Sequence, residues 1–117
     1  KNDESFGFKI NHCEKFKKQG TDKIAERIKK RVGSHPLYLS IDIDVLDPAF
    51  APGTGTPEIA GMTTREMVNV IRGLSGLNLI SADVVEVSPA YDHAEVTSLA
   101  AATIVYELTN LFAKIKR

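Results

Sequence analysis

The spacing of apolar residues predicts three amphipathic helices. Over residues 21–32, apolar side chains fall on one face and charged ones on the other, with Thr21 as a suitable N-cap. A second stripe at helical spacing covers 67–74, directly after a capping-box pattern at 63–66. A third stripe, longer than the others, covers 96–112. We therefore expect helices that each bury one face.

Two nearly continuous apolar runs, 37–43 and 77–87, predict strands that are buried on both faces of a sheet. Residues 5–10 alternate loosely and predict a further short strand. Strands that alternate with helices are typical of parallel βαβ units whose helices cover the sheet. The pattern therefore predicts an α/β fold with a mainly parallel sheet.

A long segment rich in proline and glycine, residues 46–61, has no periodicity and predicts an irregular loop. Loops of this length in compact domains are usually functional or disordered. Part of it, 51–58, superficially resembles a phosphate-binding loop, but Thr-Pro follows its last glycine where Lys-Ser/Thr is needed. We expect its glycines to let the backbone run close to a metal site or a neighbouring subunit.

Composition narrows the function classes. The 117 residues carry 15 Lys+Arg and 15 Asp+Glu, and this neutral balance argues against a dedicated nucleic-acid or membrane-surface binder. No apolar run looks long enough to span a bilayer, and residues 1–4 do not begin a signal peptide. Cys13 is the single cysteine, which favours a reducing compartment, cytoplasmic or mitochondrial, over secretion. Because the first residue is not Met, we expect a processed chain or a fragment.

The charges are unevenly distributed. Residues 1–31 hold ten Lys/Arg and five Asp/Glu, whereas 32–117 hold five Lys/Arg and ten Asp/Glu. The basic part is most simply a solvated helix face. The acidic part is more informative, because its carboxylates lie among apolar residues.

Asp42 and Asp44 are the strongest chemical signal. Two positions apart on a strand, they would point to the same face, at the carboxyl end where parallel sheets bind ligands. Two carboxylates in apolar surroundings are costly unless neutralised, and hard oxygen donors favour Mg²⁺ or Mn²⁺ over Zn²⁺. The alternative is a pair of strand-end residues that face water and cap a loop.

Glu86 is the second signal, because it lies at the carboxyl end of the other predicted strand. If the two strands are adjacent, Glu86 reaches the same rim as Asp42 and Asp44, where it could bind a cationic substrate group. The alternative is a structural salt bridge to Arg65 or Arg72. We expect Asp83, which strand alternation turns away from Glu86, to be structural.

Two segments resemble the ureohydrolase (arginase/agmatinase) family. Residues 40–58, which read Ser-Ile-Asp-Ile-Asp-Val-Leu-Asp-Pro and continue through Pro-Gly-Thr-Gly-Thr-Pro-Glu, are similar to its C-terminal signature. Residues 84–94, Val-Val-Glu-Val-Ser-Pro-Ala-Tyr-Asp-His-Ala, resemble its agmatinase-like branch. The similarity covers the chain from about residue 38 onward.

The resemblance implies a three-layer α/β/α fold in which a hydroxide bridging two Mn²⁺ ions hydrolyses a linear guanidino compound to urea and an amine. In that scheme Asp42 bridges both metals, Asp44 binds one of them, and Glu86 orients the guanidinium group. The resemblance also implies a homo-oligomer in the full-length protein, and no nucleic-acid or membrane partner.

The sequence departs from the family pattern in its histidines. The family's Gly-Gly-Asp-His-type and Asp-Ala-His-x-Asp-type motifs do not occur, so two of six expected metal ligands are present. We therefore expect residues 1–117 to be the C-terminal portion of a single ureohydrolase domain, inactive alone, with the remaining manganese ligands outside this chain. His93 precedes a helix and is expected to be polar surface.

Three rival interpretations remain. An aspartate-nucleophile phosphohydrolase would match the Asp-x-Asp pattern but needs a downstream lysine, and none lies between Asp47 and Lys114. A glycosyltransferase-type Asp-x-Asp leaves the Pro/Gly loop without a role. A non-catalytic fragment or interaction module is distinguished by whether the gene continues upstream into the missing ligand motifs.

Overall fold

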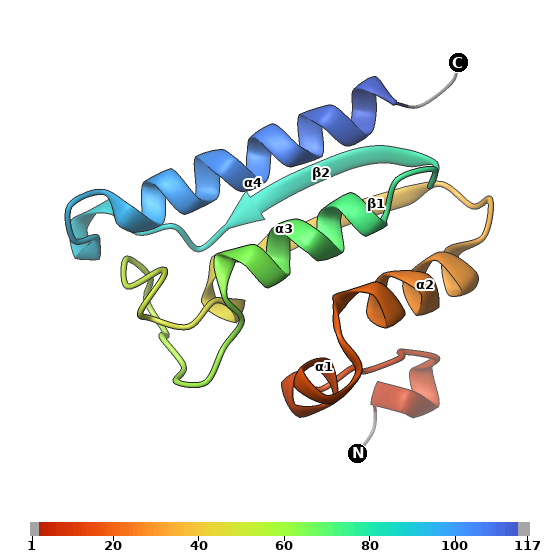
Figure 1. Cartoon of the computed structure of the whole chain (residues 1–117), viewed down its shortest axis with the longest axis horizontal. Helices are drawn as coiled ribbons and strands as arrows, with labels where there is room; N and C mark the ends of the chain where they lie inside the picture. The colour runs from red at the N-terminus through yellow and green to blue at the C-terminus, as the bar shows by residue number, and fades with distance from the viewer. Residues whose placement is uncertain (1–2, 115–117) are drawn as a thin grey trace.

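Two parallel strands lie at the centre of the computed structural model, which describes residues 3–114 (Figure 1). Strand β1 (Leu37–Asp42) pairs with β2 (Leu79–Val85), with Ser40 opposite Asp83 and Asp42 opposite Val85. Helix α3 (Thr64–Gly73) connects them, as a parallel crossover requires. The expected α/β class with a parallel sheet is therefore confirmed.

The other helices also match or extend the predicted pattern. The helices are α1 (Cys13–Gln19), α2 (Thr21–Val32) and α4 (Val96–Ala113), with short 3₁₀ turns η1 (Asp3–Phe6), η2 (Ile43–Val45) and η3 (Pro89–Tyr91). Helix α1 was not expected from the sequence. Helix α2 begins one residue earlier than predicted, with Gly20 at the N-cap position and Thr21 inside the helix.

The predicted capping box starts α3. The Thr63 hydroxyl accepts a hydrogen bond from the Glu66 backbone N–H at 3.1 Å, and the Glu66 carboxylate accepts one from the Thr63 N–H at 2.7 Å. Both bonds satisfy backbone donors that the first turn of a helix leaves without a partner. The helix start that follows the long loop is thereby specified locally.

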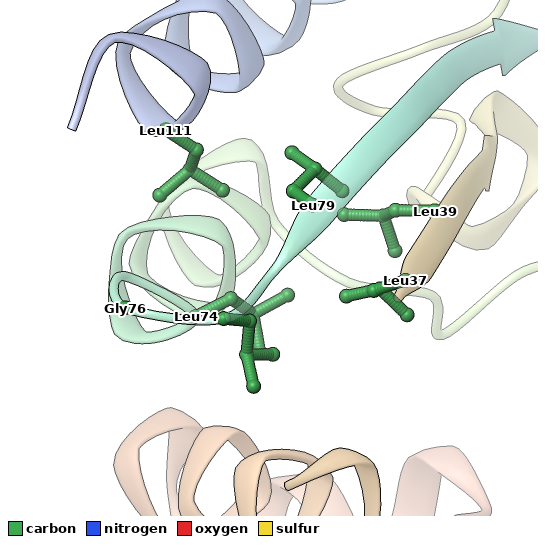
Figure 2. A pocket seen from close by; sticks show the side chains of 7 residues that line it. Leu37, Leu39, Leu74, Gly76, Leu79 and Leu111 are labelled. Atoms are coloured by element: carbon green, nitrogen blue, oxygen red, sulfur yellow. The ribbon is translucent and has the colours of Figure 1, made fainter. Parts of the chain in front are cut away.

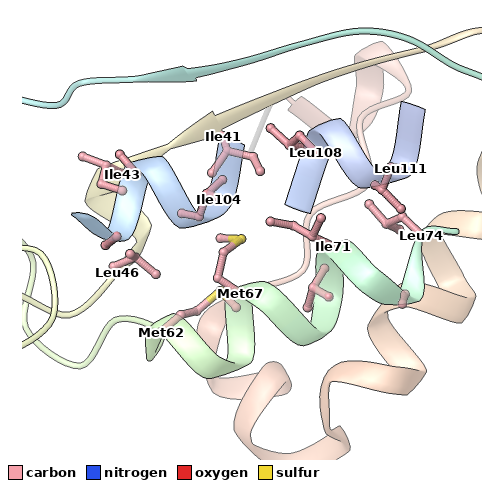
Figure 3. Packing of buried hydrophobic residues seen from close by; sticks show 14 of the residues in the cluster. Ile41, Ile43, Leu46, Met62, Met67, Ile71, Leu74, Ile104, Leu108 and Leu111 are labelled. Carbon is pink, nitrogen blue, oxygen red and sulfur yellow. The ribbon is translucent and has the colours of Figure 1, made fainter. Parts of the chain in front are cut away.

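The hydrophobic core lies between one face of the sheet and helices α3 and α4 (Figure 3). Ile43, Ile71 and Ile104 are at most 1% exposed, and they come from η2, α3 and α4 respectively. A small apolar cavity of about 10 Å³ lies between Leu37, Leu79 and Leu111, at the amino ends of the strands (Figure 2). It has room for no more than one water.

The opposite face of the sheet is exposed, which corrects the expectation of strands buried on both faces. Tyr38 is 56% exposed and Ile80 62% exposed. On this face the hydroxyls of Tyr38 and Ser40 both donate hydrogen bonds to Asp83, the second at 2.7 Å. Those bonds lower the pKa of the Asp83 carboxyl, and the bond to Asp83 raises the pKa of Tyr38. Asp83 thus makes the structural contacts expected of it.

Helix α4 corrects the expectation about membrane-spanning runs. Its 18 residues are long and apolar enough to cross a bilayer by length and composition alone. Core packing explains part of this composition, because Ile104, Leu108 and Leu111 are buried in the core, whereas Leu99 and Tyr106 are exposed. Its one acidic residue, Glu107, is buried and accepts two hydrogen bonds from Arg72 of α3.

The strand predicted over residues 5–10 is absent, and η1 and irregular backbone occupy that segment. Gly7 has a φ of +86°, a conformation that interrupts an extended run. Within the described residues, this segment pairs with neither β1 nor β2. The loose alternation of this segment is therefore not a strand signal.

Candidate metal centre

The predicted site residues gather at the carboxyl ends of the two strands. Asp42 is the last residue of β1 and lies opposite Val85, the last residue of β2, so Glu86 follows at the same rim. The loop 46–61 and the segment 88–95 lie at this end of the sheet (Figure 1). The register of the two strands therefore brings Asp42 and Glu86 to one rim, as expected of adjacent parallel strands.

The geometric reason given for Asp42 and Asp44 is wrong in one respect. The strand ends at Asp42, and Asp44 lies in η2, so strand alternation does not place the two side chains. Instead the Asp42 carboxylate caps η2 by accepting a hydrogen bond from the Asp44 N–H at 2.9 Å. The loop-capping alternative therefore describes one oxygen of Asp42, whose side chain remains exposed.

Two threonines of the loop 46–61 form hydrogen bonds with the carboxylate of Asp44. The Thr54 hydroxyl donates to Oδ1 and the Thr56 hydroxyl donates to Oδ2, so each oxygen has a hydroxyl partner. Thr54 is 4% exposed, whereas Thr56 is exposed. Both threonines were missed at the sequence level, although they lie in the segment 40–58 that resembles the family signature. This arrangement orients Asp44 without neutralising it.

Glu86 has a left-handed backbone conformation, and its carboxylate makes no hydrogen bond within the described residues. Its φ is +65°, a left-handed conformation that non-glycine residues rarely adopt. Its carbonyl oxygen lies 3.0 Å from the Thr54 hydroxyl. Within the described residues, no hydrogen bond or ion pair involves its exposed carboxylate.

The salt-bridge alternative for Glu86 is not what the structure shows. Arg72 pairs with Glu107, with Nη2 and Oε1 2.5 Å apart. That hydrogen bond lowers the pKa of the Glu107 carboxyl against the opposing effect of burial. Arg65 makes no ion pair with Glu86 either, within the described part of the chain. The Glu86 carboxylate is therefore available to a ligand.

The loop 46–61 is fastened at both of its ends. The Asp47 carboxylate accepts hydrogen bonds from the N–H groups of Ala49 and Ala60, each at 2.9 Å. A Cβ at Gly61 would lie 2.6 Å from the Asp47 nitrogen, which explains the glycine there. Asp47 and Met62 are also joined by a backbone hydrogen bond of 2.9 Å. The absence of periodicity thus does not mean a mobile segment.

The middle of the loop is fastened to the start of α4. The Gly53 N–H donates to the buried Thr97 hydroxyl at 2.7 Å, and the Gly53 carbonyl accepts from Ser88 at 2.8 Å. Asp92 accepts hydrogen bonds from the N–H groups of Thr97 and Ser98, at 2.9 and 2.8 Å. Burial raises the pKa of Asp92, but these hydrogen bonds outweigh it and hold the pKa far below its usual range.

The donor set of the rim fits part of a metal site. Carboxylate oxygens of Asp42 and Asp44 are the hard ligands that Mn²⁺ or Mg²⁺ prefers. No group of three or more His, Cys, Asp or Glu side chains is arranged to hold a metal within the described residues. His93 is exposed, as expected. Any metal at this rim therefore needs ligands in addition to these two.

Comparison with known proteins identifies the family of this chain. The Arginase family model matches residues 1–110, so the chain belongs to the arginase family. A relative from Schizosaccharomyces pombe is 56% identical over 97% of the chain, and the agmatinase of Photorhabdus laumondii is 50% identical over 95% of it. The chain spans only 29% and 36% of the lengths of these two relatives.

A solved structure supports the same relationship. The proclavaminate amidino hydrolase of Streptomyces clavuligerus superposes with a TM-score of 0.92 at 40% sequence identity. The superposition covers 97% of this chain and 38% of that one. The expected arginase-like α/β architecture is thereby confirmed, and the chain corresponds to about a third of a larger enzyme fold.

Proposed function

We propose that residues 1–117 are the C-terminal portion of a single ureohydrolase domain that hydrolyses a linear guanidino compound, of the agmatine type, to urea and an amine. The main support is that Asp42, Asp44 and Glu86 all lie at the carboxyl ends of the two paired strands, in a chain that belongs to the arginase family. The agmatinase name of the Photorhabdus laumondii relative supports the substrate class.

Asp42 and Asp44 would hold manganese in a binuclear centre whose other ligands come from outside this chain. When bound, such a centre supplies activated water for attack on the guanidinium carbon. The Thr54 and Thr56 hydroxyls keep the Asp44 carboxylate in one orientation, which reduces the freedom it must lose when it coordinates a metal.

Glu86 would bind and orient the guanidinium group. Its carboxylate is exposed at the rim, and within the described residues neither Arg65 nor Arg72 pairs with it, since Arg72 is paired with Glu107. A planar guanidinium presents several N–H donors, and a carboxylate accepts two of them in parallel. Fixing the cation in this way would bring its carbon to a set distance from the metal-holding carboxylates.

The test is urea release with Mn²⁺ and a panel of guanidino compounds, on this chain and on the longer parent protein. We expect urea from the parent and none from the chain alone. In the parent, Asp42→Asn should weaken Mn²⁺ binding and lower urea release by more than about 100-fold, because losing a ligand exceeds the effect of losing an outer-shell partner.

Two results would contradict the proposal. One is urea production by Asp42→Asn at the parental rate, and the other is a parent protein without activity on any compound of the panel. Asp22→Asn, which removes an exposed carboxylate in the first turn of α2, is the matched control and should retain full activity. The chain alone should bind Mn²⁺ weakly, because two carboxylates do not complete an octahedral shell.

A further inference from the structure

The buried hydroxyl of Thr54 touches both halves of the proposed site. It donates to Oδ1 of Asp44, and it lies 3.0 Å from the carbonyl oxygen of Glu86. Asp44 lies just after β1 and Glu86 just after β2, 42 positions apart in the chain. Thr56, by contrast, contacts Asp44 only. Thr54 is therefore the one described side chain that bridges the candidate metal ligand and the candidate substrate-binding residue.

The backbone at Glu86 requires support from its surroundings. A non-glycine residue at a φ of +65° is in a sparsely populated conformation, which persists only where neighbouring contacts hold it. Two such contacts come from the loop 46–61. The Thr54 hydroxyl lies 3.0 Å from the Glu86 carbonyl oxygen, and the Gly53 carbonyl accepts a hydrogen bond from the Ser88 N–H at 2.8 Å. The loop therefore has a direct influence on the direction of the Glu86 side chain.

We propose that Thr54 is a positioning residue that couples occupancy of Asp44 by a metal to the conformation of the substrate-binding segment 86–88. This inference rests on the proposed function for the roles of Asp44 and Glu86. A hydroxyl has one hydrogen and two acceptors compete for it here, so a change in the charge on Asp44 alters how that hydrogen is shared with the Glu86 carbonyl. The segment 86–88 thereby responds to the metal through one side chain.

The experiment compares Thr54→Val with Thr56→Val in the parent protein. Calorimetry with Mn²⁺ alone should show that each variant weakens metal binding by about 10- to 100-fold, the usual effect of removing a partner that orients a ligand. Amide hydrogen exchange over 86–88 should become slower when Mn²⁺ binds the parental protein. Thr54→Val should abolish that Mn²⁺-dependent change, and Thr56→Val, measured at saturating Mn²⁺, should retain it.

Three further variants keep the test independent of folding. Thr54→Ser preserves the hydroxyl and should restore the Mn²⁺-dependent protection, whereas Thr54→Ala should lack it even if Thr54→Val does not fold. Thr109→Val is the matched control, because the hydroxyl of Thr109 bonds only to the Val105 carbonyl of its own helix, at 2.9 Å. It should leave metal affinity and exchange unchanged.

The outcomes separate this inference from the proposed function. Protection of 86–88 by Mn²⁺ in both Thr54→Val and Thr54→Ala would overturn the coupling, whatever the urea assay shows. A parental protein with no effect of Mn²⁺ on this segment would overturn it as well. If the parent releases no urea but the coupling is present and lost in Thr54→Ala, the proposed function fails and the role of Thr54 stands.

Discussion

Ile71 and Ile104 are enclosed by apolar neighbours between the sheet and two helices, whereas Asp44 and Glu86, at the ends of the same strands, are placed almost wholly by hydrogen bonds. The first region is stabilised by the hydrophobic effect, which has no preferred direction, so a side chain can be replaced by another apolar one of similar volume. The second depends on individual hydroxyls, N–H groups and close glycine contacts. Changes in the core should therefore have the largest effect on stability, and changes at single hydrogen bonds or glycine contacts should have smaller ones.

The largest effect on stability is expected in the core. Ile104→Ala should lower the free energy of unfolding by about 2 to 5 kcal/mol, because it removes buried methylene groups and leaves a cavity. Urea denaturation followed by circular dichroism measures this. Val105→Ala, at the next position of α4 and 50% exposed, is the control and should change stability by less than about 0.5 kcal/mol. Equal losses in the two variants would contradict the assigned core.

An intermediate effect on stability is expected at Gly61, where the end of the loop 46–61 packs against the backbone at its start. Gly61→Ala places a Cβ within 2.6 to 2.8 Å of backbone atoms of Val45, Leu46 and Asp47, and these atoms cannot move aside as a side chain would. We expect a loss of about 1 to 3 kcal/mol in the same denaturation experiment. Gly55→Ala is the control, since a Cβ there meets no atom within 4 Å. An unchanged midpoint for Gly61→Ala would show that the loop is not fastened at this point.

The smallest effect is expected at the start of α4, and it depends on pH. The pKa of Asp92 is lower in the folded chain than its unfolded value, near 4, so its contribution is complete above about pH 4 and declines as pH falls further. Asp92→Asn cannot ionise and should unfold about 5 °C below the parental protein at pH 7, typical of losing a helix cap.

Thermal unfolding between pH 7 and pH 2 tests this expectation. The difference between the two proteins should be constant above about pH 4 and shrink below it. The matched control is Glu95→Gln, which removes a carboxylate at the same helix start that makes no capping hydrogen bond. A difference that stays constant down to pH 2 would contradict the assigned role of the Asp92 carboxylate.

Local patterns in the sequence were sufficient for the main elements of the fold. The capping box at Thr63 and Glu66 forms, and the apolar stripes of α2 and α3 face the core. The stripe of α4 does so only in part, because Ile104 and Leu108 are buried whereas Val96, Leu99 and Phe112 are exposed. These features depend on neighbours three or four positions away, so periodicity reports them directly. The weak alternation over residues 5–10 was misleading because a strand also needs a partner edge, which local sequence does not reveal.

The sequence by itself also determined which carboxylates are candidates for chemistry, since Asp42, Asp44 and Glu86 follow apolar runs and lie in family-like segments. Only the tertiary structure decided how they are held. Thr54 meets Asp44 and the backbone of Glu86 because the loop crosses the ends of two strands that are paired side by side. Such contacts join residues far apart in the chain, and their geometry depends on strand register and loop path, which residue types alone do not specify.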